Sequence, residues 1–330
     1  MRGLLPAATA MVLALVLAGC GGAVDTAKVT YQRTTVPAGQ TGGTGSATAT
    51  GEPQTNDPAF SNAKLRTIDP CGLLTKDLLS NVGEPADNDR SDFGECGNYM
   101  ADDKDEDLSI TLTLGDNVSN PQDADQNIGG LPAIENELDS GDACFVTVVT
   151  STQPNFGITI QAGGDSKELC KAGRTVMTGV VDQIRTDPPA YDTGKGTLLE
   201  LDPCEVVKDA PLRAALGNGA DAGAPYNLHW CNWHSPTANL GLWLRIGFDP
   251  AKASSGGKAV ALGGGVTGYT TTTTSSAASC ELQWGHRRFS GQDTEIVHIF
   301  YDKPKPVKGE DPCKAPLALA KSLISVLPKT

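Results

Sequence analysis

Basic side chains, aromatic side chains and long apolar runs are all scarce in this sequence of 330 residues. It contains 26 Lys and Arg against 39 Asp and Glu, which gives a net charge of −13. A nucleic-acid-binding protein needs a basic face to neutralise phosphates, so this charge argues against that class. The one long apolar run lies at the N-terminus, which excludes a protein that crosses the membrane several times.

Signatures of catalysis are missing as well. The sequence contains no Gly-x-Ser-x-Gly elbow, no His-Glu-x-x-His, no phosphate loop and no Rossmann fingerprint. No two cysteines have the Cys-x-x-Cys spacing of redox-active or zinc-binding thiols. We therefore predict a protein that is not an enzyme and has no cofactor and no metal site.

Cysteine, in contrast, is frequent, and its number is odd. Nine cysteines favour an oxidising compartment, in which disulfides use them in pairs. After Arg2, an apolar segment from Leu4 to Leu17 is too short for a stable transmembrane anchor. It ends in Leu17-Ala18-Gly19-Cys20, which resembles a bacterial lipobox.

The lipobox explains the odd cysteine. It predicts that residues 1–19 are a signal peptide and that the thiol of Cys20 receives a lipid, with an ordinary secretory signal as the alternative. Two acyl chains would hold the protein firmly at the outer face of the cell membrane. Residues 20–63, rich in Gly, Thr, Ser and Pro, predict a flexible linker. About 43 residues of this composition span roughly 35 Å.

The remainder of the chain has the signs of a duplication. Asp69-Pro70-Cys71 recurs as Asp202-Pro203-Cys204, and the eight other cysteines divide four and four. Their successive gaps are 25, 48 and 26 residues in the first half and 27, 49 and 33 in the second. We predict two homologous domains, 64–190 and 199–330, joined by a linker at 191–198.

Each half has the pattern of an α+β fold. Asp69 and Asp202 suit helix N-caps followed by a proline, and the first helix is expected to continue to Val82. Alternating or β-branched segments predict three strands in each half, at 108–114, 144–150 and 157–162, then at 240–246, 280–284 and 295–301. Closing helices are expected at 167–184 and 314–326. Each domain should be an antiparallel sheet with an N-terminal and a C-terminal helix.

Four cysteines in each half allow three pairings per half, and the duplication favours the same choice in both. The pairing that joins the start of each terminal helix to a strand is Cys71–Cys96, Cys144–Cys170, Cys204–Cys231 and Cys280–Cys313. Loops of about 25 residues contribute on the order of 3 kcal/mol each in the chain-entropy account.

The string IDPCGLLTKDLL, placed after a lipobox and a linker, resembles the actinobacterial lipoproteins of domain-of-unknown-function family three-five-five-eight. These look like Asp-Pro-Cys-x-Leu-Leu-Thr, then a cysteine about 25 residues later in a Cys-x-Trp-like strand. The matching positions are Asp69 to Thr75 and then Cys96, and the second half fits best at Cys231-Asn232-Trp233. The sequence departs from the usual pattern by carrying two copies. The resemblance implies an envelope location and a lipid anchor, and it supplies no activity and no catalytic residues.

Charge and aromatic content differ between the halves. Residues 64–190 carry 9 basic and 23 acidic side chains, whereas 199–330 carry 13 and 12. The run from Asp123 to Asn127 begins like a calcium loop but lacks its later Gly and Glu, so a solvated acidic loop is preferred. All four histidines and all four tryptophans lie in the second half. They are His229, His234, His286, His298, Trp230, Trp233, Trp243 and Trp284.

A zinc site at these histidines is an alternative, but their spacing does not support it. The aromatic second half is where we expect a binding groove. We predict a non-catalytic binding or adaptor module of the cell envelope. Its expected partner is another envelope protein, and we expect no binding of nucleic acid. The alternatives are a carrier of a small molecule, lipid or metal, and an unrecognised envelope hydrolase. The oligomeric state is left open.

Overall fold

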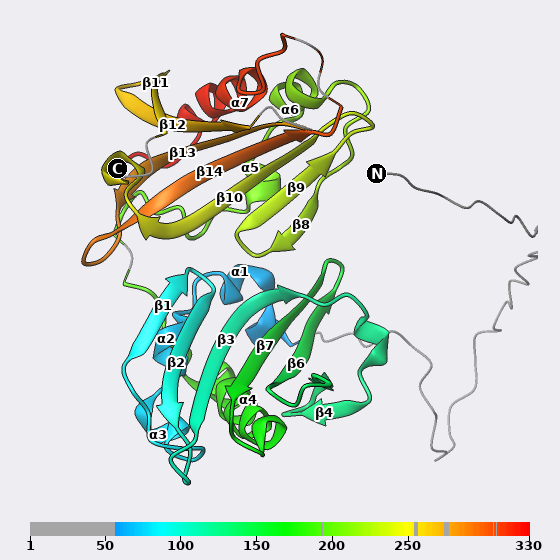
Figure 1. The fold of residues 1–330 in the computed structure, drawn as a ribbon, viewed down its shortest axis with the longest axis vertical. Coiled ribbons are helices and arrows are strands. Elements are labelled where there is room, and N and C mark those ends of the chain that lie inside the picture. The colour runs from blue at the N-terminus through cyan, green and yellow to red at the C-terminus, as the bar shows by residue number, and fades with distance from the viewer. Residues whose placement is uncertain (1–56, 193, 254–256, 274–276, 306, 308) are drawn as a thin grey trace, which may run out of the picture. The chain divides into compact units, whose positions relative to one another are not determined.

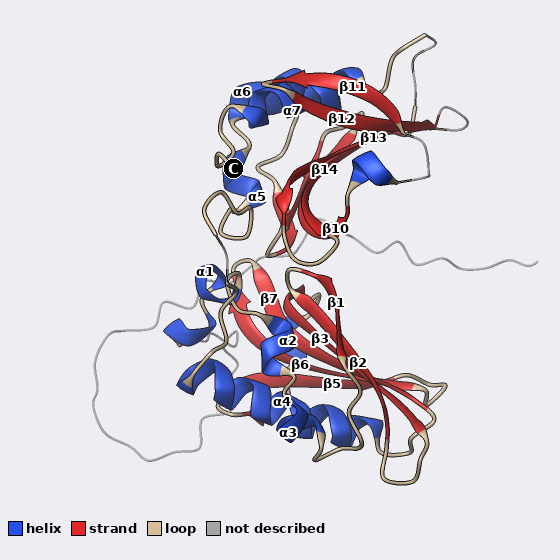
Figure 2. Ribbon diagram, turned by 90° about the vertical axis from the view of Figure 1, so that its left-hand side faces the viewer, coloured by secondary structure: helices blue, strands red, loops and turns tan. Residues whose placement is uncertain are grey.

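The computed structural model describes residues 57–330 apart from 193, 254–256, 274–276, 306 and 308. Signal peptide, Cys20 and most of the expected linker lie outside the described residues. The chain forms two seven-stranded antiparallel sheets, and the α-helices cover one face of each (Figures 1 and 2). None of the described helices has the length and apolar content to cross a membrane.

The first sheet has the strand order β1-β2-β3-β7-β6-β5-β4. Its strands are β1 (Asn88–Asp92), β2 (Glu95–Ala101), β3 (Asp107–Asn117), β4 (Gln126–Ile128), β5 (Leu131–Glu137), β6 (Ala143–Thr152) and β7 (Asn155–Gly164). The helical segments of this half are η1 (Pro58–Phe60), α1 (Asn62–Leu65), α2 (Pro70–Leu73), α3 (Lys76–Leu79), η2 (Pro121–Asp123) and α4 (Leu169–Thr186). The long helix α4 packs on β6 and β7 and buries a stripe of aliphatic side chains there.

The second sheet has the order β8-β9-β10-β14-β13-β12-β11. Its strands are β8 (Ala224–Asn227), β9 (Trp230–His234), β10 (Asn239–Phe248), β11 (Lys258–Gly263), β12 (Val266–Thr273), β13 (Ala278–Arg288) and β14 (Asp293–Lys303). The helical segments are α5 (Pro203–Val206), α6 (Asp209–Leu216), η3 (Pro250–Lys252) and α7 (Lys314–Ile324). Helix α7 packs on β11, β13 and β14.

The two sheets agree in strand order and also in register. Cys96 pairs with Leu112, which pairs with Ile160 in the first sheet. The corresponding chain of partners in the second sheet runs from Cys231 to Leu242 to Ile299. The register therefore agrees over this stretch of the central strands, and it diverges at Gly115, where β3 has a bulge that β10 lacks.

The fold has more β-structure than the sequence predicts. Three strands were expected in each half, and each sheet has seven. The expected first helix up to Val82 is wrong, because the chain breaks at Leu74 and restarts at α3. Thr75 adopts an extended conformation and caps the new helix by accepting a hydrogen bond from Leu78 N at 3.2 Å. The expected closing helices correspond to α4 and α7.

Four disulfides fix helical segments to strands. They join Cys71 to Cys96, Cys144 to Cys170, Cys204 to Cys231 and Cys280 to Cys313. In each half, the first bond ties the Asp-Pro-Cys turn to the second strand, and the other ties the start of the closing helix region to the sixth strand.

Two hairpin tips connect the halves. Phe93, between β1 and β2, is fully buried and belongs to the hydrophobic core of the second half. Leu228, between β8 and β9, is buried in the core of the first half. There its side chain fills the space that a Cβ on Gly115 would occupy. The internal contacts accordingly place both sheets in one compact unit.

Candidate functional site

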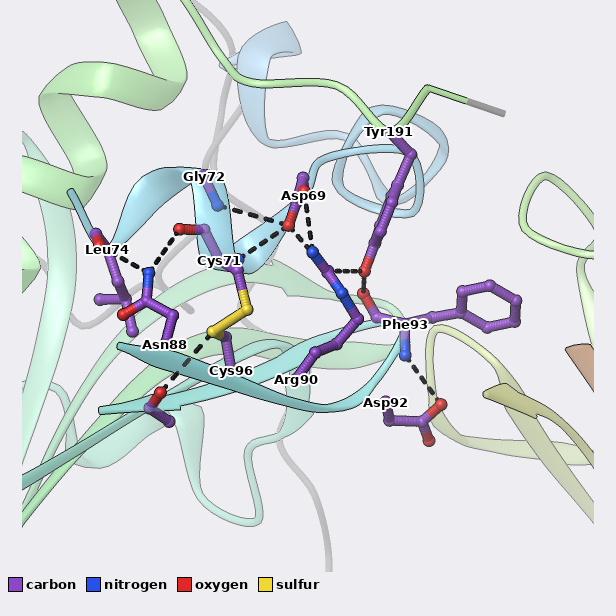
Figure 3. Close-up of polar contacts among 11 residues, drawn as sticks. Asp69, Cys71, Gly72, Leu74, Asn88, Arg90, Asp92, Phe93, Cys96 and Tyr191 are labelled. Atoms are coloured by element: carbon purple, nitrogen blue, oxygen red, sulfur yellow. Dashed lines mark hydrogen bonds and ion pairs between the residues drawn. A yellow bond between two sulfur atoms is a disulfide. The ribbon is translucent and has the colours of Figure 1, made fainter. Parts of the chain in front are cut away.

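The Asp-Pro-Cys sequence of the first half is a structural device (Figure 3). The Asp69 carboxylate caps α2 by accepting hydrogen bonds from Cys71 N and Gly72 N at 2.8 and 3.3 Å. It also accepts hydrogen bonds from both terminal nitrogens of Arg90, at 2.7 and 3.0 Å. Arg90 in turn donates to the Tyr191 hydroxyl, which donates to Phe93 O. The network holds the base of the β1–β2 hairpin in place.

Asp92 stands at the tip of this hairpin and is half-buried. Its carboxylate accepts hydrogen bonds from the Trp243 indole at 3.0 Å, from Ile246 N at 3.1 Å and from its neighbour Phe93 N at 2.7 Å. Burial raises the pKa of Asp92 to about 6 despite these donors. The tip is therefore a half-buried acid at a contact between the halves, and no nucleophile or second acid is bonded to it among the described residues.

The second Asp-Pro-Cys sequence is used differently. Asp202 caps α5 by accepting a hydrogen bond from Cys204 N at 2.8 Å. Its other carboxylate oxygen accepts a hydrogen bond from Arg66, a residue of the first half, at 2.8 Å. Arg66 also donates to Leu228 O. The neighbouring His229 is buried against the Phe93 ring, and burial lowers its pKa to about 3, so the imidazole is neutral. Neither of its ring nitrogens has a hydrogen-bond partner among the described residues.

The described residues contain one group with metal-ligand proximity, formed by Glu135, Cys144 and Cys170. Both cysteines are joined in a disulfide and Glu135 is paired with Arg174, so these atoms are not available as ligands. Asp123 and Asp125, the start of the calcium-like run, line an open cleft of about 460 Å³ together with Asn117 and Glu135.

The tryptophans of the second half separate into two groups. Trp233 and Trp284 are buried in the core beneath the helices. Trp230 and Trp243 have the opposite parity on their strands and lie on the face of the second sheet opposite α7, where the short segment η3 packs on β12 and β13. We call this surface, which carries no α-helix among the described residues, the helix-free face of the second sheet.

Register divides the helix-free face into three rows that cross β9, β10, β14 and β13. The aromatic row consists of Trp230, Trp243, His298 and Gln283. The middle row consists of Asn232, Gly241, Phe300 and Glu281. The polar row consists of His234, Asn239, Asp302 and Ser279.

Rings of the aromatic row stand in a stack. Trp230 and Trp243 are 5.1 Å apart between centroids with planes 17° from parallel. His298 continues the stack on Trp243 at 6.1 Å and 27°. Each indole N–H is already used: Trp230 donates to Asn232 Oδ1 at 2.8 Å and Trp243 donates to Asp92. These bonds fix the orientation of both rings.

Phe300 lies flat on the sheet beside this stack. A Cβ placed on Gly241 would be 1.8 Å from Cζ of Phe300 and 2.2 and 2.4 Å from its two Cε atoms. If the edge of the ring pointed at the glycine, the Cβ would lie in the plane of the ring beyond Cζ, and its distances to the two Cε atoms would be longer than these. The face of the Phe300 ring therefore covers Gly241. Trp230 is perpendicular to Phe300 at 5.3 Å, and His298 is tilted by 69° from it at 5.9 Å. The face of Phe300 and the edge of the stack thus form an aromatic corner.

The first sheet has small or polar groups at most of the equivalent positions. Its counterpart of the aromatic row is Glu95, Thr113, Thr159 and Thr147. The positions of Gly241 and Phe300 are taken by Thr111 and Gln161. Since the same strand order and register form with these residues, the fold does not require the aromatic corner.

Sequence reasoning located part of this site. It named Trp230, Trp243 and His298 among the aromatic residues of the second half and pointed to that half for a binding groove. It missed Phe300, whose role depends on the register that sets it over Gly241. A glycine in a strand of large side chains was the available signal, because such a glycine often marks close approach by another group.

Comparison with known protein families gives one match. The family model "Protein of unknown function (DUF3558)" matches residues 15–183, half of the chain. The chain belongs to this family. The match covers the first sheet and α4 up to Gln183, and it does not extend to the second sheet. No curated protein and no solved structure matches the chain.

Proposed function

We propose that this DUF3558 protein is a membrane-anchored extracytoplasmic lipoprotein that acts as a non-catalytic binding module of the cell envelope. We further propose that its halves are tandem copies of one domain, of which the first is the copy that the family model matches. The shared strand order and register, together with the repeated Asp-Pro-Cys sequence, support this duplication.

The aromatic corner is the observation that carries the binding function. Large aromatic rings on a sheet face without an α-helix expose apolar surface to water, which is unfavourable unless a ligand or partner covers them. The first sheet has threonines at most of the positions that correspond to the aromatic row. Tyr226 extends the stack at one end and is 52% exposed. Trp, Tyr and Arg are the residues that most often dominate binding energy at interfaces.

A photo-crosslinking amino acid at Glu281 tests this proposal in intact cells. Glu281 is exposed in the middle row beside Phe300, so we expect it to capture the bound component. The matched control is Phe145, the equivalent position of the first sheet, where we expect no specific capture. Equal capture at both positions, or none at Glu281, would contradict a binding role for this face.

The anchor has a separate test. Cys20→Ala should block lipid attachment and signal cleavage, so the unprocessed precursor should accumulate and no lipidated mature form should appear. Globomycin, which inhibits the lipoprotein signal peptidase, should act likewise on the unaltered chain. The same mature form from Cys20→Ala and from the unaltered chain would refute lipidation at this residue.

A further inference from the structure

We propose that the aromatic corner binds a six-membered sugar ring of a neutral polysaccharide; this inference rests on the proposed binding function and specifies its ligand. Phe300 is half-buried, and the face of its ring turned away from Gly241 is the surface that the sugar would contact. Its inner face covers Gly241, and its two ring neighbours, Trp230 and His298, stand at 90° and 69° to it. Neither neighbour therefore stacks on the outer face. An apolar C–H face of a sugar ring can lie there.

The standing rings limit what else can enter. Trp230 is stacked on Trp243, and the Tyr226 ring contacts it at 4.4 Å with a tilt of 47°. Trp243 is covered by Trp230 on one side and by the Arg245 guanidinium, 4.3 Å from its ring centroid. The stack therefore offers ring edges, which carry partial positive charge and attract oxygen atoms rather than cations. A quaternary ammonium ligand needs several open aromatic faces and is disfavoured.

Hydrogen-bonding groups lie at a suitable distance. The polar row lies next to the middle row, which contains Phe300, and the two rows are two residues apart along each strand. Residues on the same face of a strand that are two positions apart are separated by about 7 Å. Asn239 and Asp302 face each other there and their side chains make no hydrogen bond within the described part of the chain. Their amide and carboxylate oxygens can accept hydroxyl hydrogens of a ring that rests on Phe300.

Charge selects a neutral ligand. The acidic side chains around Phe300 are Glu281, its cross-strand partner, and Asp302, two residues along β14. Glu281 stays ionised because the His298 imidazole, 3.6 Å away, lowers the pKa of its carboxyl. An anionic polymer would be repelled by these carboxylates, whereas hydroxyl groups are good donors to them.

Affinity electrophoresis of the full-length protein in native gels tests the inference. The gels contain dextran, mannan, galactan or xylan, with dextran sulfate as the anionic comparison. We expect retardation by at least one neutral polysaccharide and not by dextran sulfate. Phe300→Leu, which keeps apolar bulk without a flat face, should weaken retardation about tenfold, as should Asp302→Ala. Gln161→Ala, the position equivalent to Phe300 in the first sheet, should leave it unchanged.

The outcomes separate the ligand from the proposed function. The sugar site is overturned if none of the four neutral gels retards the protein, or if Phe300→Leu and Asp302→Ala are retarded as strongly as the unaltered protein. Competition by choline would assign the corner to a cation instead. Crosslinking from Glu281 to a protein, with no retardation, would overturn the sugar ligand while leaving a binding module in place. The urea unfolding midpoint of each variant shows whether lost retardation reflects lost folding.

Discussion

At the scale of single residues, Asp92 is the group with the clearest dependence on pH. It is half-buried at the tip of the β1–β2 hairpin, where loss of solvation raises its pKa to about 6, against about 3.9 for an unfolded chain. The folded state therefore binds its proton more tightly than the unfolded state does. Protonation of Asp92 stabilises the fold, and ionisation as the pH rises through about 6 removes that stabilisation.

We expect the free energy of unfolding of the unaltered protein, relative to that of Asp92→Asn, to be about 2 kcal/mol higher at pH 4.5 than at pH 7.5. Asparagine stays neutral at both values, so the difference isolates the titration of Asp92. Urea unfolding at the two pH values measures it. Asp89→Asn, exposed on the same strand, should show no such pH dependence. A pH-independent difference for Asp92→Asn would mean that the carboxyl does not lose solvation as described.

At the scale of elements, local signals predicted the closing helices and the central strands, because their apolar periodicity is continuous. The first helix failed at Leu74, where an extended Thr75 offers a cap that competes with helix continuation. The edge strands were missed because β1, β4 and β8 are short and largely polar or exposed, and their pairing is set by neighbouring strands rather than by their own pattern. The aromatic corner depends on cross-strand register, which composition does not reveal.

The disulfides are the strongest constraint on these elements. Cys144–Cys170 closes 26 residues and ties β6 to the start of α4. Replacing both cysteines with serine should lower the free energy of unfolding by about 3 kcal/mol, because the unfolded chain gains freedom. Urea titration measures this, with the Cys280–Cys313 pair as a comparison of similar size. An unchanged midpoint would show that this bond does not restrict the unfolded chain.

At the scale of the whole molecule, the two buried hairpin tips bind the halves into one cooperative structure. We expect the protein to unfold in one calorimetric transition. Phe93→Ala should lower the free energy of unfolding by about 3 kcal/mol, because Phe93 contributes to the core of the other half. It should also separate the calorimetric transition into two.

Phe60→Ala is the matched control for this prediction. Phe60 is equally buried but belongs to the core of its own half, so its removal should lower stability without separating the transitions. A single transition for Phe93→Ala would mean that the tips are not what couples the halves.

The matching register of the two sheets has a practical consequence. Residues of the aromatic corner have equivalent positions in the first sheet: Glu95 corresponds to Trp230, Thr113 to Trp243 and Gln161 to Phe300. One sheet thus carries the aromatic corner, and the other carries mainly threonine, glutamine and glutamate at the equivalent positions, with Phe145 at the position of Glu281. Ligand recognition could be transplanted from one to the other by a few substitutions, while the underlying strands, cores and crosslinks stay the same.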